Sequence, residues 1–223
     1  ERQLLRPETL VAWGVVRSAI DGRWLIPGRN PDGRLDQLYR RIPVPNGNGS
    51  WVNKLMSLPG LWPNGAAHRL FMPNGNRLKL PEVPTPLRTS AQRSERSPSI
   101  GGTQAGKVLY ICEGPWDAMA LWEVFRYLKE RSVEVVAVPG CMVFNAQWAG
   151  AMVAYAGVNV LYDNDHPRRN PRTGSVLPAA GPTGAVRVAK ALMEAQSSRL
   201  INGSGVSEAN GVRKRRGSSE VVN

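Results

Sequence analysis

The sequence predicts an α/β fold, in which a parallel sheet flanked by helices is preceded by a small basic α+β subdomain. Three observations support this prediction. Strand-like and helix-like segments alternate over residues 108–162, two of the apolar strands end in acidic residues, and the front half of the chain is strongly basic. With 223 residues the chain can bury a real core, and its length favours one or two domains.

The first half is expected to begin with a short helix and a hairpin. Pro7 and Glu8 favour a first helical turn, and Gly14 is expected to end the helix. Strand-like runs at 23–26 and 35–42 are separated by Asn-Pro-Asp-Gly, a strong turn signal. From there to residue 82, Pro-Asn-Gly turns interleaved with aromatic residues predict irregular structure with short strands. We therefore expect a basic N-terminal subdomain over 1–82 and a linker rich in Pro, Ser and Arg over 83–107.

Residues 108–196 are predicted to form the parallel-sheet domain. Strands are expected at 108–112, 133–138 and 158–162, with helices at 118–131, 146–156 and 183–195. This alternation implies right-handed crossover connections. Trp116, Trp122 and Trp148 are expected to be core residues, and Cys112 and Cys141 buried small apolar ones. The tail over 197–223 is rich in Ser, Gly, Asn and charge and is expected to be disordered and basic.

The charge distribution points to a polyanionic partner. The formal net charge is +12; residues 1–107 carry sixteen Lys and Arg against seven Asp and Glu, whereas residues 108–196 carry eight of each. A neutral segment that can hold a cation therefore lies beside a basic one, as a site for nucleic-acid chemistry requires. A basic protein without such a partner is the alternative.

Cysteine usage and hydropathy restrict the protein's surroundings. The chain has two cysteines and no CxxC pair, which excludes a zinc ribbon within it and favours the reducing cytoplasm. No apolar run approaches the roughly 18 residues of a membrane span, and no signal peptide is visible, so no membrane partner is expected. The first residue is Glu rather than Met, which suggests that a further module precedes this chain.

Acidic side chains follow two of the predicted strands. Glu113 comes directly after 108–112, and Asp163 and Asp165 follow 158–162. Because parallel strands end at one edge of a sheet, where ligands of open α/β sheets bind, these carboxylates are expected to converge. They would repel one another unless a divalent cation neutralised them. The sequence therefore predicts a Mg²⁺ (or Mn²⁺) site and metal-dependent phosphate chemistry.

The segments EGPWDAMAL at 113–121 and DND at 163–165 resemble the TOPRIM module shared by bacterial-type DNA primases, topoisomerases and some nucleases. The resemblance covers residue 108 to about residue 195. It implies that the catalytic metal ligands are Glu113, Asp163 and Asp165. It also implies three supporting residues, namely Asp117 as a further acid, Gly114 as the turn glycine, and Gly140, whose bare backbone lets phosphate come close.

The first half resembles the subdomain that precedes TOPRIM in bacterial-type primases. The matching segments are RPETLVAWGV, RWLIPGRNPDGRLDQLYRR, and WVNKLMSLPG, which is similar to that family's KYLNSP segment. The resemblance implies that Arg23 and Lys54 bind nucleoside triphosphates or the template backbone. Arg40 and Arg41 lie in the same basic hairpin and are candidate nucleic-acid ligands as well.

The segment HPRRNPRTGSVLPAA, between Asp165 and Gly181, departs from the family, which usually enters its next helix almost directly. Arg168 and Arg169 in this segment are candidates to grip phosphates over the site. The alternative, which we favour, is a solvated loop.

These resemblances imply a DNA primase-like nucleotidyltransferase that makes short RNA primers on single-stranded DNA by metal-assisted phosphoryl transfer. The implied partners are a single-stranded DNA template, ribonucleoside triphosphates and a replicative helicase, although the family's terminal elements are not recognisable in the tail. A small TOPRIM nuclease with the same metal cluster stays open. So does a non-catalytic nucleic-acid-binding remnant of a phage or mobile-element replication protein.

Overall fold

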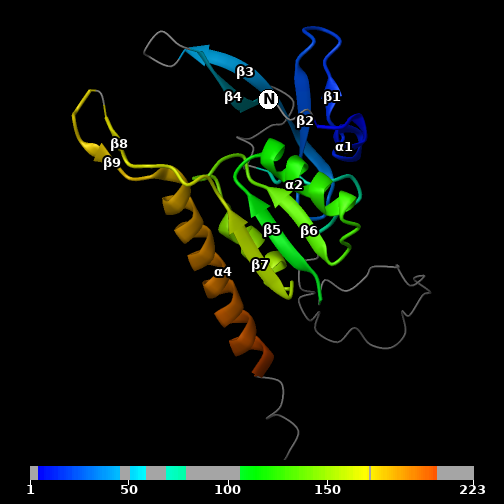
Figure 1. Cartoon of the computed structure of the whole chain (residues 1–223). Coiled ribbons are helices and arrows are strands. Elements are labelled where there is room, and N and C mark those ends of the chain that lie inside the picture. The colour runs from blue at the N-terminus through cyan, green and yellow to red at the C-terminus, as the bar shows by residue number, and fades with distance from the viewer. Residues whose placement is uncertain (1–4, 46–50, 59–68, 79–105, 171, 205–223) are drawn as a thin grey trace, which may run out of the picture.

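The computed structural model describes residues 5–45, 51–58, 69–78, 106–170 and 172–204 of the chain. These residues form a mixed α/β structure in which an antiparallel sheet, of strand order β1-β2-β3-β4, lies next to a parallel sheet, of order β6-β5-β7 (Figure 1). The predicted α/β class with a parallel sheet flanked by helices is confirmed. Nearly all of the predicted linker, and the tail beyond residue 204, lie outside the described residues.

The N-terminal elements follow the predicted helix and hairpin. Helix α1 (Pro7–Ala12) begins with proline, and the chain leaves it through Gly14, whose φ of 69° suits glycine. The four strands are β1 (Val16–Arg17), β2 (Trp24–Arg29), β3 (Leu35–Pro45) and β4 (Trp51–Ser57). Neighbouring strands are antiparallel, so the β2–β3 hairpin is confirmed.

The parallel sheet has β5 (Val108–Cys112) at its centre, between β6 (Val133–Ala137) and β7 (Gly157–Leu161). Side chains of these strands alternate between two cores, as the pleat requires. Val135 and Ala137 pack with helix α2 (Pro115–Tyr127), whereas Val136 packs with the opposite layer, which includes helix α4 (Ala180–Ser204). Figure 1 shows α2 across one face of the sheet and α4 running beside β7. The helices therefore cover both faces.

Three predicted helices have different bounds in the structure. Helix α2 begins at Pro115 rather than 118 because Gly114 serves as its N-cap and proline fits its first turn. The predicted helix at 146–156 is instead a 3₁₀ turn η2 (Ala146–Trp148) and a short helix α3 (Ala149–Met152). The chain leaves helical geometry there because the N–H of Ala156 bonds to the carbonyl of Lys107, which leads the chain into β7. Helix α4 continues to Ser204, so the first residues of the predicted disordered tail are helical.

A short segment joins the two sheets. Leu70 exchanges backbone hydrogen bonds with Arg29 of β2, at 2.8 and 3.1 Å, and Phe71 does so with Ala137 of β6, at 2.9 and 2.8 Å. Phe71 is fully buried in a core that also contains Trp13 from the N-terminal segment and Met119 from α2. The predicted regions 1–82 and 108–196 therefore share one hydrophobic core.

The segment between β7 and α4 forms a hairpin of two short antiparallel strands, β8 (Arg168–Arg169) and β9 (Val176–Leu177). Both strands are exposed, and Figure 1 shows the hairpin standing off from the parallel sheet at the start of α4. The predicted solvated loop is thus an ordered but exposed arm. Within the described ranges, no helix is both long and apolar enough to cross a membrane.

Candidate active site

An open pocket of about 220 Å³ lies at the carboxyl edge of the parallel sheet. Three acidic residues line it: Glu113 directly after β5, Asp117 in the first turn of α2, and Asp163 shortly after β7. Their convergence follows from the parallel arrangement, because β5 and β7 run side by side and end at the same edge. The pocket is therefore acidic on the side formed by the strand ends.

Glu113 is held in place by its neighbours. Its carboxylate Oε2 accepts a hydrogen bond from the backbone N–H of Asp163 at 3.1 Å. The Cys141 thiol also bonds to this carboxylate, and its pKa is raised by burial first and then by the charge of Glu113. The backbone N–H of Glu113 donates to the carbonyl of Leu161 at 3.3 Å, which continues the ladder between β5 and β7 past the strand end. The carboxylate is thus positioned by both flanking segments.

Asp117 and Asp163 are close enough to influence each other's ionisation. The pKa of Asp117 is raised, mainly by burial and then by the negative charge of Asp163. Burial, with a smaller contribution from Asp117, raises the pKa of the Cys112 thiol to about 12. The pocket therefore carries an excess of negative charge that a bound cation would relieve.

The pocket fits a divalent cation that shares its coordination with phosphate. Among the described residues, no three His, Cys, Asp or Glu side chains are grouped so as to hold a metal ion by themselves. Mg²⁺, however, commonly takes only one or two carboxylates together with water and substrate phosphates. Glu113 and Asp163 supply two carboxylates in one pocket, and the pKa of Asp117 beside them is raised by burial and then by the charge of Asp163.

Asp165, the third predicted ligand, does not line the pocket. Its carboxylate accepts a hydrogen bond from the backbone N–H of Gly181 at 3.4 Å and pairs with Arg168 at 3.4 Å. Helix α4 comes this close because Gly181 has no side chain, since a Cβ there would lie 1.9 Å from the Asp163 carbonyl oxygen. The structure thus brings Glu113 and Asp163 together with Asp117 and turns Asp165 toward α4.

Both predicted supporting glycines lie in the pocket wall. Gly114 caps α2, and a Cβ at this position would meet the Asp117 carboxylate at 3.3 Å. Gly140 follows β6 with a φ of 156°, and the nearest atom to a Cβ there would be 3.9 Å away. A bare backbone therefore lines the pocket just after β6.

A basic and aromatic wall completes the pocket. Arg41 of β3 and Trp116 of α2 both line it, and the Arg41 guanidinium lies 5.9 Å from the centre of the Trp116 ring. Trp116 is half-buried rather than a full core residue, whereas Trp148 is buried as predicted. The sequence analysis placed Trp116 in the core and missed its position in the pocket wall. Its place in the chain between two acidic pocket residues, Glu113 and Asp117, would have indicated that position.

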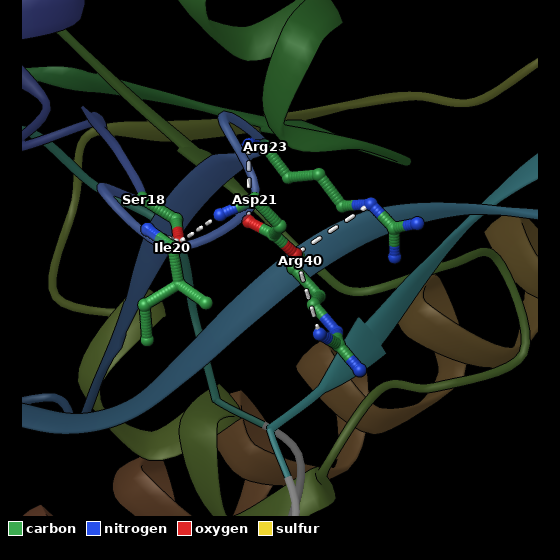
Figure 2. Close-up of polar contacts among 5 residues, drawn as sticks. All are labelled: Ser18, Ile20, Asp21, Arg23 and Arg40. Carbon is green, nitrogen blue, oxygen red and sulfur yellow. Dashed lines mark hydrogen bonds and ion pairs between the residues drawn. The ribbon is translucent and has the colours of Figure 1, made fainter.

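The other predicted basic residues lie away from the pocket lining. Arg23 and Arg40 both pair with Asp21, each at 3.6 Å, as Figure 2 shows. Lys54 is an exposed residue of β4. Arg168 and Arg169 lie on the exposed β8–β9 hairpin, where Arg168 contacts Asp165.

No protein-family model, curated protein or solved structure matches this chain, so the case for its function rests on the site itself.

Proposed function

We propose that this chain is a DNA primase-like nucleotidyltransferase of the TOPRIM type, which joins ribonucleotides on a single-stranded DNA template with the help of Mg²⁺ or Mn²⁺. One observation carries the proposal. Glu113 and Asp163, from two parallel strand ends, are linked by a hydrogen bond in a pocket that also holds Arg41. Carboxylates for a cation and a guanidinium for phosphate in one pocket are what triphosphate chemistry requires.

In this proposal Glu113 and Asp163 hold the cation. When bound, the cation supplies charge stabilisation to the phosphoryl oxygens and to the pyrophosphate leaving group. Arg41 donates to the phosphates and offsets their charge, while the bare backbone at Gly140 lets them approach. The half-buried Trp116 ring offers a stacking surface for a base.

The joining step forms one bond and breaks another. The 3′ hydroxyl oxygen attacks the α-phosphorus, the bond between the α-phosphorus and its bridging oxygen breaks, and pyrophosphate leaves. Asp117 is the carboxylate best suited to accept the hydroxyl proton, because its raised pKa makes it a stronger base than an ordinary aspartate. No covalent intermediate with the protein is needed.

The test is incubation with single-stranded DNA and labelled ribonucleotides, in Mg²⁺ and in a chelator. New short RNA that depends on Mg²⁺ and is absent from Asp163→Asn supports the proposal. Metal-dependent shortening of the DNA would instead favour a nuclease that uses the same carboxylates. If both substrates stay unchanged and the folded protein takes up no Mn²⁺, the result favours a non-catalytic nucleic-acid-binding remnant.

A further inference from the structure

Helix α4 carries an exposed apolar stripe along one side. Its other side packs on η2, α3 and β7, where Val188 is fully buried. The stripe lies opposite this packed side, and Figure 1 shows the helix at the flank of the molecule, beside β7. The large side chains of the stripe are 71%, 69% and 69% exposed, and they are Val186, Met193 and Leu200. A contiguous apolar surface of this kind indicates a face that docks on a partner.

The pattern of the stripe is symmetric about Met193. Its five residues are separated by 3, 4, 4 and 3 positions, which keeps them on one side of the helix: Val186, Ala189, Met193, Ser197 and Leu200. Large side chains lie at the centre and at both ends, with a small residue between each pair. A second copy of the helix, antiparallel about a two-fold axis at Met193, therefore matches large residues with large and small with small. The small residues let the two helices come close.

Charged side chains border the stripe on one flank. Lys190 and Glu194 are exposed, lie about one turn apart and line the same shallow groove as Met193. In an antiparallel pair related by a two-fold axis, this flank lies on the same side of both copies. The Lys190 of one copy is then displaced by only roughly 3 Å along the helix axis from the Glu194 of the other, and the contact occurs twice. Opposite charges therefore face one another along this edge, which favours the antiparallel arrangement.

We infer that the exposed face of α4 binds the same face of a second copy of this chain, as an antiparallel helix pair centred on Met193. The inference does not depend on the proposed function. A contact made by one helix from each copy is smaller than the roughly 1,200 Å² of a standard interface, so the expected dimer is weak. The chain after Ser204 is a poorer occupant of this face, because Gly, Ser, Asn and the run RKRR interrupt its apolar residues.

Pairing about Met193 keeps the two acidic pockets apart. Helix α4 begins beside the pocket, where the Gly181 N–H donates to Asp165. Gly181 precedes Met193 by twelve positions, which is roughly 18 Å along the helix axis. The antiparallel arrangement therefore puts the starts of the two helices, and with them the two pockets, roughly 36 Å apart along the pair. The dimer thus carries two separate sites rather than one shared site.

Sedimentation equilibrium of the full chain, over micromolar to millimolar concentrations, tests the inference. Physiological ionic strength is used because the net charge of +12 opposes association and a Debye length of about 8 Å screens it. We expect a reversible equilibrium between monomer and dimer. Met193→Glu should weaken the dimer at least about thirtyfold, since two carboxylates would meet at the two-fold axis. The control Val124→Glu changes an exposed valine of α2 and should keep the wild-type association.

Charge exchange tests the direction of the pairing. Lys190→Glu and Glu194→Lys each place like charges along the shared edge, so each variant alone should associate several-fold more weakly than the wild type. An equimolar mixture of the two variants should recover the wild-type association, because one copy then carries two acids and the other two lysines on that edge. Circular dichroism is expected to show wild-type folding, since all the changed positions are exposed.

Three results would overturn the inference. The first is a monomer at every concentration of the wild type. The second is unchanged association in Met193→Glu, which would place the dimer contact on another surface. The third is a mixture of the two charge variants that associates no more strongly than either variant alone, which would exclude the antiparallel pairing of Lys190 with Glu194.

Discussion

The carboxylate of Glu113 accepts a hydrogen bond from the backbone N–H of Asp163 at 3.1 Å, although the two residues lie 50 positions apart in the chain. The contact joins the segments that follow β5 and β7. It fixes the direction of one carboxylate and places the other beside it in the same pocket. A site built this way is organised before any ligand arrives, which is what efficient phosphoryl transfer requires.

The two aspartates of the DND segment have different surroundings, so their variants are expected to differ in activity. Asp163→Asn should abolish primer synthesis, whereas Asp165→Asn, whose side chain lies outside the pocket, should keep most of it. Asp165→Asn keeps an oxygen that can accept the hydrogen bond from the Gly181 N–H and loses only an exposed ion pair with Arg168. Its free energy of unfolding should therefore fall by less than about 1 kcal/mol, with little change in melting temperature. Thermal unfolding and primer synthesis are measured side by side. Full synthesis by Asp163→Asn, or loss of synthesis in a folded Asp165→Asn, would contradict the assigned site.

Arg41 should act on nucleotide binding through its charge. Arg41→Gln is expected to raise the KM for ribonucleotides at least about tenfold, the usual cost of one charge-assisted hydrogen bond to phosphate. Arg41→Lys should recover part of this loss, because it restores the charge but not the planar donors. The exposed Arg131, on the turn before β6, gives the control Arg131→Gln, which should keep the wild-type KM. An unchanged KM in Arg41→Gln would remove Arg41 from the site.

Asp117 should make the protein less stable as the pH rises. Its pKa is raised above the ordinary value of 3.8 by burial and by Asp163, so the folded chain holds this proton to a higher pH than the unfolded chain does. Ionisation of Asp117 therefore opposes folding: the cost is absent below pH 3.8 and is complete above the folded-state pKa. Asp117→Asn is expected to raise the melting temperature in a chelator at neutral pH, and less so near pH 4. An equal shift at both pH values would show that the charge is not the cause.

The close approach of α4 to the site depends on two glycines one turn apart. A Cβ at Gly181 would lie 1.9 Å from the Asp163 carbonyl oxygen, and one at Gly184 would lie 2.3 Å from that of Cys141. Gly181→Ala should therefore cost about 1–3 kcal/mol and lower activity by moving the Asp163 backbone. The control is Gly150→Ala in α3, where nothing lies within 4 Å of a Cβ, and it should be neutral or stabilising. Equal stability of the two variants by denaturant unfolding would refute the packing argument.

The parallel sheet was predictable because its strands are short, β-branched runs bounded by clear breaks. The bounds of β5 agree with the sequence prediction, those of β6 differ by one residue at its end, and those of β7 differ by one residue at each end. The early end of the helix predicted at 146–156 could not be predicted in the same way. Its alanine-rich sequence favours a helix, but the hydrogen bond from Ala156 to Lys107 stops the helix so that the chain can enter β7.

Pairings between segments far apart in the chain could not be predicted from the sequence. The link from Leu70 and Phe71 to Arg29 and Ala137 joins segments with no shared local pattern, so the common core of the two halves could not be inferred from composition. The placement of Arg40 and Arg41 on opposite faces, by contrast, follows from strand alternation alone once the hairpin is accepted.

The central claim is that Glu113 and Asp163 together hold a divalent cation, and Mn²⁺ binding followed by electron paramagnetic resonance tests it most directly. The titration uses wild-type protein and the double variant Glu113→Gln with Asp163→Asn, each with a non-hydrolysable ribonucleoside triphosphate present. We predict that the wild type takes up Mn²⁺ with the nucleotide and that the double variant, folded by circular dichroism, does not. Equal Mn²⁺ uptake by both proteins would contradict the claim.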